Sequence, residues 1–196
     1  ALSTKLCVEV YKEGQVYFQS YHIGKPDEPV KVIGTCDSEK HGTKVTFHPD
    51  PEIFEETVYD YDTLKQRLRE TAFLTKGLRI VLTDTREESH HCHEFHYAGG
   101  IKEFVTYLNR SKEALYPDVI YCEGTRDGVY VEVAMQHNDS YNDATYSFVN
   151  NIITPEGGTH LAGFRNALTK TFNTYARANK ILKDSEPALT GDDIRE

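Results

Sequence analysis

The sequence predicts an α+β protein, and three observations carry this prediction. Short runs of alternating apolar and polar residues, separated by Gly, Pro and Asp, fill the first part of the chain and indicate antiparallel strands. Apolar residues at helical spacing begin near residues 61, 101 and 161 and indicate three helices. Further strand-like runs lie between these helices. No internal repeat or low-complexity segment is visible.

The N-terminal region is expected to form a sheet. Residues 6–12 and 15–21 alternate as two strands around a Glu-Gly turn, and shorter strands are expected at 30–33 and 43–47. A Pro-Asp-Pro sequence follows and ends the strand pattern, because proline cannot donate a hydrogen bond to a strand ladder.

Helices and strands alternate in the middle of the chain. The first helix is expected from residue 61, because Tyr61 and the apolar residues that follow at helical spacing share one face, whereas Arg67, Arg69 and Glu70 are expected to face outward. A short second helix is expected over 101–108. The strands expected around these helices are 78–82, 119–122, 129–135 and 146–150.

The stretch 157–165 reads GGTHLAGFR and leads into the longest amphipathic pattern. Gly157 and Gly158 permit a tight backbone approach, and Thr159 is placed to cap the first helical turn. Apolar residues then recur on one face up to Tyr175. A long helix over 161–178 is therefore expected.

Composition limits the classes of function. The chain has 196 residues, 38% of them hydrophobic and 27% charged, as is ordinary for a soluble globular protein. Its formal net charge of −9 argues against wrapping nucleic acid over the whole surface, so any DNA contact is expected at a local basic patch. No apolar run approaches the roughly 20 residues that span a bilayer, and no signal segment is present, so a cytosolic location is expected.

Two features bear on metal and redox chemistry. The four cysteines lie far apart without a CxxC pair, which indicates reduced thiols. The segment 90–96 reads HHCHEFH, and strand alternation would place His91, His93 and Phe95 on one face. A pair of histidines is then possible but a full tetrahedral set is not. A polar edge strand that titrates near pH 6.5 is the alternative to a zinc or nickel site, and no metal ligand is assigned.

Both ends of the sequence suggest a piece of a longer protein. Thr190 and Asp193 have the spacing of a capping box, with an acidic first turn, yet three residues later the sequence stops. At the other end a strand pattern begins almost at once, without an initiator Met. A frayed tail is the alternative explanation of the C-terminus.

These motifs together resemble one family. GGTHLAGFR, the flanking FVNNI, the earlier FHYAGGIKEFVTYLN and GTKVTFHPD, and the terminal TGDDIRE are similar, in the same order, to the B subunits of bacterial type II DNA topoisomerases. This family includes the B subunits of DNA gyrase and topoisomerase IV, and the wording of LAGFR and NTYARANKILKD favours the gyrase branch. The resemblance covers essentially the whole chain.

The resemblance implies two partial domains. Residues 1–97 would be the C-terminal half of a GHKL-type ATP-binding sandwich, the fold shared with Hsp90, histidine kinases and MutL. Residues 98–196 would be the first part of a transducer domain, which resembles the second domain of ribosomal protein S5. The helix over 161–178 is then the candidate for the stiff element that relays the nucleotide state to the DNA gate.

The resemblance also implies nucleotide-binding residues. Thr43, in the Gly-Thr of the GTKVTF strand, would contact adenine through a water, and Val45 would pack on the base. Lys12 occupies a position at the mouth of the nucleotide pocket where many members carry an arginine and which is associated with aminocoumarin drugs; lysine keeps the charge but loses the planar fork. The alternatives are a strand residue chosen for β propensity at Thr43 and a solvated lysine beside Glu13 at position 12.

Basic residues of the long helix are expected to face DNA. In this family the paired transducer domains enclose a cavity that the transported duplex enters, and Arg165, Lys170 and Arg177 would line it. Sparse cationic groups would hold phosphates loosely, which suits a duplex that must pass on. A solvated helix face is the alternative.

The activity implied is that of the whole family protein, an ATP-hydrolysing isomerase. It would use ATP and Mg2+ to drive DNA strand passage and negative supercoiling, as a homodimer of B subunits that joins the gyrase A subunits in an A2B2 assembly in the cytoplasm. The family's catalytic glutamate, magnesium-holding asparagine and glycine-rich lid match nothing here, so no catalytic residue is assigned and the chain alone is expected to be inactive. The alternatives are topoisomerase IV, a purely structural or interaction module, and a histidine-cluster metal protein.

Overall fold

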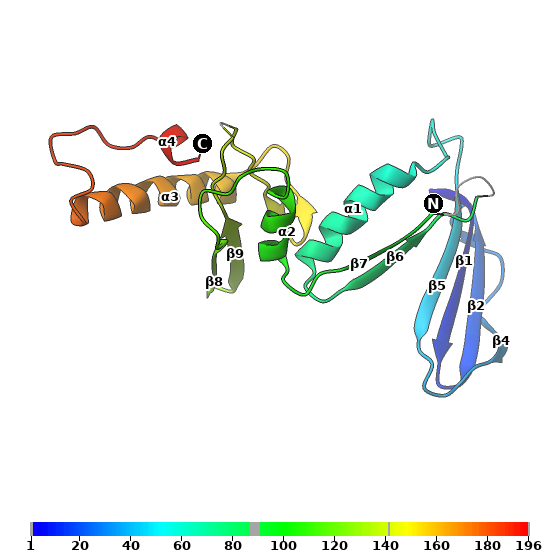
Figure 1. Cartoon of the computed structure of the whole chain (residues 1–196). Helices are drawn as coiled ribbons and strands as arrows, with labels where there is room; N and C mark the ends of the chain where they lie inside the picture. The colour runs from blue at the N-terminus through cyan, green and yellow to red at the C-terminus, as the bar shows by residue number, and fades with distance from the viewer. Residues whose placement is uncertain (1, 87–90, 141, 196) are drawn as a thin grey trace. The chain divides into compact units, whose positions relative to one another are not determined.

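The computed structural model describes residues 2–86, 91–140 and 142–195. The chain forms two compact units, Ala1–Asp60 and Tyr61–Glu196. The first is built from strands, and the helices of the described chain all lie in the second (Figure 1). The predicted α+β class is confirmed.

The first unit is an antiparallel sheet. Its strands run in the order β3-β2-β1-β5, and β4 also pairs with β2. Glu13 and Gly14 join β1 to β2 with positive φ angles of 53° and 74°, the left-handed geometry of tight hairpin turns. The four predicted strands are present with shifted bounds, and β3 was not expected. The strands are β1 (Ser3–Lys12), β2 (Gln15–His22), β3 (Lys25–Pro26), β4 (Lys31–Thr35) and β5 (Gly42–Pro49).

This sheet buries little of its own apolar surface. Among its described residues Val16 is buried, whereas Val32, Val45 and Phe47 are about half exposed. The sheet ends where expected, at the Pro-Asp-Pro sequence. There the buried Asp50 carboxylate accepts the backbone N–H of Glu52 at 3.0 Å and closes a turn.

The second unit begins with a helix on a hairpin. Helix α1 (Tyr61–Leu74) contacts both strands of the hairpin, β6 (Arg79–Thr83) and β7 (Cys92–His96), as Figure 1 shows. Across the hairpin, Arg79 donates two hydrogen bonds of 2.8 Å to the carboxylate of Glu94. The pKa of Glu94 is lowered because these guanidinium N–H groups stabilise its ionised form.

An aromatic cluster forms the core of this unit. Phe73 of α1 and Phe95 of β7 are fully buried. Phe73 stacks on Tyr97 with 3.6 Å between ring centroids, and on Phe104 of α2 (Ile101–Leu108) at 4.9 Å. Because aromatic rings bury large areas, this cluster fixes α1, β7 and α2 to one another.

One orientation predicted for α1 was wrong. Arg69, expected to face outward, is partly buried and donates from Nη1 to the Tyr107 hydroxyl at 2.7 Å. Its guanidinium also lies 5.6 Å from the Phe95 ring centroid and 5.1 Å from that of Tyr107. Arginine can cover aromatic rings while its charged head stays hydrated, so helical periodicity alone could not assign its direction.

Two hairpins and two helices complete the second unit. The predicted strand at 146–150 is confirmed only in part, since β10 contains two residues. Helix α3 begins two residues earlier than expected. Thr190 and Asp193 form the predicted capping box, with Asp193 Oδ2 accepting the backbone N–H of Thr190 at 2.7 Å. The elements are β8 (Ile120–Arg126), β9 (Val129–Met135), β10 (Phe148–Val149), β11 (Ile152–Ile153), α3 (Thr159–Ala178) and α4 (Asp192–Arg195).

The domain boundary expected near residue 97 lies inside the second compact unit. Tyr97 stacks on Phe73 from one side of that boundary, and Phe104 packs on the same ring from the other. The boundary stays a prediction, because a compact unit in the structure and a family domain are different divisions of a chain. None of the helices in the described residues has both the length and the apolar character to cross a membrane.

Candidate functional site

The residues predicted to bind nucleotide share one face of the first sheet. Thr43 lies opposite Val10 and Val45 lies opposite Val8 in the β1–β5 register. Directly opposed residues of paired strands point to the same side, and side chains alternate along each strand. Lys12, two residues beyond Val10 on β1, therefore lies on this face as well. The face presents a hydroxyl group, exposed apolar surface and an ammonium group.

Lys12 itself has a local ion pair. Its Nζ lies 3.4 Å from Oε1 of Glu13, and both side chains are exposed. An exposed pair of this kind holds a lysine weakly, so the ammonium group stays available to a stronger anion. The position of Lys12 is compatible with the pocket mouth and equally with the alternative of a solvated lysine beside Glu13.

The opposite face of the same sheet carries a charged cluster. Glu9 Oε2 accepts a hydrogen bond of 2.9 Å from the Tyr11 hydroxyl, and Glu9 Oε1 accepts one of 3.1 Å from Lys44 Nζ. These donors lower the pKa of Glu9, the Tyr11 hydroxyl first and the Lys44 ammonium second. The charged cluster and the predicted nucleotide residues are thus separated by the sheet.

The GGTH motif forms the entry to α3. Gly157 and Gly158 both have positive φ angles, 72° and 150°, and Gly158 is the N-cap. The expectation that Thr159 caps the helix was wrong, because Thr159 is already the first helical residue and Gly158 has no side chain to bond the free N–H groups. A Cβ on Gly157 would lie 3.1 Å from a methyl group of Leu161, so the motif also needs glycine there for packing.

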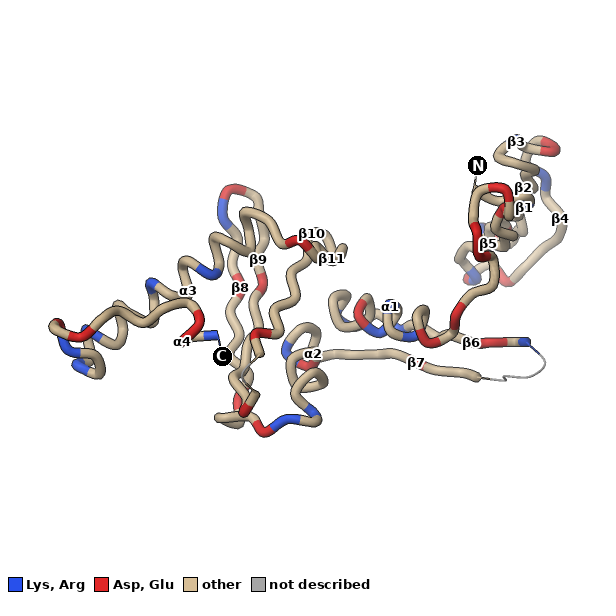
Figure 2. Tube along the Cα trace, turned by 90° about the horizontal axis from the view of Figure 1, so that it is seen from above, with Lys and Arg blue, Asp and Glu red and all other residues tan. Residues whose placement is uncertain are grey.

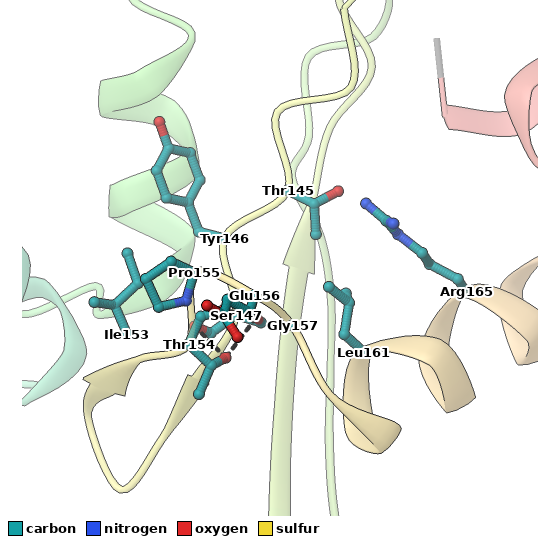
Figure 3. Close-up of a pocket in the computed structure, with 10 residues that line it drawn as sticks. All are labelled: Thr145, Tyr146, Ser147, Ile153, Thr154, Pro155, Glu156, Gly157, Leu161 and Arg165. Atoms are coloured by element: carbon teal, nitrogen blue, oxygen red, sulfur yellow. Dashed lines mark hydrogen bonds between the residues drawn. The ribbon is translucent and has the colours of Figure 1, made fainter.

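Two cavities adjoin this entry. The first, of about 210 Å³, lies between the β10–β11 hairpin and α3, with Tyr146, Leu161 and Arg165 among its lining residues (Figure 3). The second, of about 420 Å³, is lined by Arg165, Asn166 and Arg195 beside the glycine turn. Glu156, Gly157, Leu161 and Arg165 line both, so the two cavities meet at the start of α3.

Hydroxyl groups hold the wall of the first cavity. The Ser147 and Thr154 side chains lie 2.7 Å apart, and the Thr154 backbone N–H donates to the Ser147 carbonyl at 2.8 Å. Nε2 of His160, in the first turn of α3, lies 3.3 Å from Thr154 Oγ1. His160 therefore serves local structure, as the sequence predicted, by linking the hairpin to the helix.

Arg165 faces these cavities and is held by an aspartate. Its Nη2 donates to Asp143 Oδ2 at 3.1 Å, and in Figure 3 its side chain extends from α3 toward Thr145. Arg195 of α4 donates from Nε to the same Asp143 oxygen at 3.0 Å. Neither Asp143 nor Arg195 was assigned a role from the sequence, since a single aspartate in a loop and an arginine after a capping box have no distinguishing pattern.

The other two basic residues predicted to face DNA lie elsewhere on α3. At about 100° per residue, Lys170 and Arg177 fall within about 20° of each other, whereas Arg165 lies about 120–140° away around the axis. Figure 2 shows the basic residues spread along the helix. Lys170 is exposed. The structure thus places Lys170 and Arg177 on one face and Arg165 on another.

Arg177 has structural partners. Its Nη1 donates to the Lys183 carbonyl at 2.8 Å, and its Nη2 donates to the Glu186 carbonyl at 3.0 Å. These bonds attach the loop after α3 to the helix. Asn173 adds two further bonds to the backbone of Leu189, at 2.9 and 2.8 Å. Arg177 is therefore largely occupied by backbone carbonyl groups.

The histidine-rich segment does not form a metal-ligand set in the described residues. His93 packs against Phe95 at 4.8 Å between ring centroids, and His91, which precedes β7, packs against Tyr61 at 5.3 Å. His90 lies outside the described residues. Where the chain is described, no three His, Cys, Asp or Glu side chains are grouped to hold a metal ion.

Comparison with known proteins gives consistent matches. A family model described as DNA gyrase B matches residues 100–196. The DNA gyrase B subunit of Clostridium acetobutylicum is 55% identical over 197 residues, which cover 100% of this chain and 30% of that protein. The protein of the same name from Halalkalibacterium halodurans is 54% identical with the same coverage. The chain thus spans 30% of the length of these relatives.

Solved structures with this fold agree. The 43K ATPase domain of Thermus thermophilus gyrase B, in complex with an aminocoumarin, has a TM-score of 0.83 and 36% identity, and the match covers 99% of this chain and 52% of that one. The B-subunit of the DNA gyrase from Myxococcus xanthus has a TM-score of 0.81 at 24% identity over 89% of this chain and 51% of that one, which bears on the fold alone.

Proposed function

Because the chain belongs to the DNA gyrase B family, we propose that it forms part of the ATP-operated clamp of a bacterial type II DNA topoisomerase. The observation that carries this proposal is 55% identity to a DNA gyrase B subunit along the whole chain, together with the fold of a gyrase ATPase domain. The full-length protein would bind and hydrolyse ATP, dimerise around a duplex, and act with the gyrase A subunit in the cytoplasm.

We assign residues 1–97 to the ATP-binding domain and residues 98–196 to the transducer. The aromatic cluster around Phe73 would then be the contact between the two domains, since its rings come from both sides of residue 97. Such a contact is stiff, because closely packed rings transmit displacement. A change in the ATP-binding domain would reach α2 through this cluster.

Thr43 and Val45 suit the adenine end of ATP. Both lie on the same exposed face of β5, where a hydroxyl can donate and accept hydrogen bonds and Val45, which is 54% exposed, offers apolar surface. Lys12, on the same face, would add positive charge at the mouth of the pocket. Bound ATP would supply the phosphates whose hydrolysis drives the clamp, and Mg2+ would be held by residues other than these three.

Arg165 is the best supported of the proposed DNA contacts. It lines a cavity and is 38% exposed, whereas Arg177 is engaged by carbonyl groups and Lys170 lies on a different face of α3. In the full-length protein, Arg165→Gln should leave ATP binding intact and weaken the stimulation of ATP turnover by DNA. Equal stimulation in the variant and the wild type would remove Arg165 from the DNA path.

The second candidate is topoisomerase IV. A topoisomerase IV ATP-binding domain from Francisella tularensis has a TM-score of 0.77 at 23% identity, over 98% of this chain and 51% of that one, so both enzymes share the fold. The names of the relatives closest in sequence among those compared favour gyrase. The structure of the clamp segment does not separate the two reactions, because supercoiling and decatenation differ in how DNA is presented to it.

Plasmid topology tests the proposal. The full-length protein, reconstituted with its cognate A subunit, is incubated with relaxed circular DNA in the presence and absence of ATP. Negative supercoiling that needs ATP is the expected result. Relaxation or decatenation alone would assign topoisomerase IV, and no topological change would overturn the proposed clamp function.

A further inference from the structure

One carboxylate joins two arginines at the second cavity. Asp143 Oδ2 accepts a hydrogen bond from Arg165 Nη2 at 3.1 Å and another from Arg195 Nε at 3.0 Å. The two arginines come from α3 and α4, which lie far apart in the sequence. Asp143 therefore brings two guanidinium groups to the same cavity of about 420 Å³, which both of them line.

The bonding capacity of this group is unequally used. The Asp143 carboxylate is well satisfied, because Thr145 also donates from its hydroxyl to Oδ1. Arg195 has a second partner in Asp192, whose Oδ1 accepts from Arg195 Nη2 at 3.1 Å. Arg165 is less satisfied: its buried Nε has no hydrogen-bond partner among the described residues. A guanidinium group carries five N–H donors, so Arg165 retains capacity for a further acceptor.

The ion pairs are also accessible. The side chains of Arg195, Asp143 and Arg165 are 21%, 28% and 38% exposed. Partly exposed ion pairs are weak, since water and salt screen them, so another anion can compete with the carboxylate. Phosphate is a suitable competitor, because two of its oxygens match the fork of a guanidinium group and it carries the same unit charge in a DNA backbone.

We propose that this cavity binds a phosphate of the DNA backbone, with Arg165 and Arg195 as its ligands and Asp143 as the internal counter-ion that the phosphate replaces. The inference rests on the proposed function in a DNA clamp. Arg165 and Arg195 contact no base edge in this arrangement, so binding is independent of sequence. Glu156, an exposed carboxylate that also lines the cavity, opposes the phosphate and keeps its binding weak.

Phosphate binding would change how α4 is held. Two contacts attach α4 to the rest of the unit: the Arg195–Asp143 pair, and the hydrogen bond of 2.7 Å between His137 Nε2 and the Ile194 carbonyl. When phosphate takes both arginines, the first contact is lost and the second remains. DNA occupancy is thereby reported to α4, and hydrogen exchange of the amides in 192–195 should rise when duplex is added.

The test is the binding of a duplex oligonucleotide to the full-length protein, in its ATP-analogue-bound form, over a range of KCl concentrations. Each phosphate contact contributes about 0.9 to the slope of log affinity against log salt. Arg195→Gln should therefore lower that slope by about 1 and weaken binding several-fold at low salt. Arg195→Lys keeps the charge without the fork, so it should retain the slope and lose part of the affinity.

Two aspartate variants separate competition from general charge. Asp143→Asn removes the internal competitor and should tighten duplex binding by roughly threefold to tenfold at low salt. Asp192→Asn removes the same charge beside Arg195 but leaves the Arg165–Asp143 pair intact, so its effect should be clearly smaller. Circular dichroism spectra of each variant show whether it is folded.

Two results would overturn the inference. An Arg195→Gln variant that is folded and keeps the wild-type slope and affinity would remove Arg195 as a ligand. Equal effects of Asp143→Asn and Asp192→Asn would remove the competition. Both differ from failure of the clamp function itself, in which the wild-type protein neither binds duplex nor supercoils plasmid.

Discussion

Replacing Phe73 by alanine should destabilise the second unit more than any single change on its surface. Phe73 is 1% exposed and its ring lies 3.6, 4.9 and 5.4 Å from the ring centroids of Tyr97, Phe104 and Tyr107. Truncating a buried phenylalanine costs about 3–5 kcal/mol. The three ring contacts place Phe73 toward the upper end, since an aromatic pair adds about 0.5–1.5 kcal/mol beyond burial. Typical domain stabilities are about 5–15 kcal/mol, so much of the free energy of unfolding would be lost.

Urea unfolding, followed by far-ultraviolet circular dichroism, measures this loss in a chain that has no tryptophan. Hydrogen exchange with mass spectrometry then locates it. Amides of α1, β6, β7 and α2 should exchange faster in the variant, whereas those of β1 in the first unit should not change. The matched control is Phe47→Ala, because Phe47 is 47% exposed and should cost at most about 1 kcal/mol.

The reasoning would be refuted if Phe73→Ala and Phe47→Ala lowered the unfolding midpoint equally. It would also fail if exchange rose in α1 but not in α2, because the cluster would then not join the two sides of residue 97. Faster exchange in both helices would instead support the proposal that the aromatic cluster couples the ATP-binding domain to the transducer.

Three further predictions concern pH, catalysis and inhibitor binding. The pKa of Tyr121 is raised because the carboxylates of Glu123 and then Glu132 accept its hydrogen bond, so this bond should stabilise the β8–β9 hairpin below the ordinary tyrosine pKa of 10.0 and be lost as pH rises through the folded value; tyrosinate absorbance of the wild type minus Tyr121→Phe should show the late ionisation, and Glu123→Gln should bring it to lower pH. The 196-residue chain alone should hydrolyse no Mg2+-ATP above the buffer rate in a phosphate-release assay, and turnover that survives repurification would mean that catalytic residues were overlooked. In the full-length protein, Lys12→Arg should lower the inhibitory concentration of an aminocoumarin by about tenfold, the effect of one added charge-assisted hydrogen bond, whereas Lys12→Ala should raise it; unchanged inhibition in both would leave Lys12 outside the pocket.

Local patterns determined most of the secondary structure. The alternation in 6–12 and 15–21, the helical spacing after Tyr61 and Ile101, and the capping box at Thr190 all appear in the structure, because each depends on neighbours within a few residues. The GGTH motif led to the family, and the comparisons agree with that resemblance. At Thr159 the same kind of signal failed, since two glycines with positive φ let the helix begin one residue earlier than a threonine cap would.

The partners of charged side chains were decided only by the tertiary structure. Arg69 belongs by periodicity to the outer face of α1, yet its long side chain reaches Tyr107 of α2. Arg165 and Arg177 look alike on one helix, but Asp143 holds the first at a cavity, whereas carbonyl groups of the following loop hold the second. The sequence determined the strands, the helices and the family, which depend on short-range order. Which arginines face a cavity depends on residues brought together from distant parts of the chain, and periodicity carries no information about them.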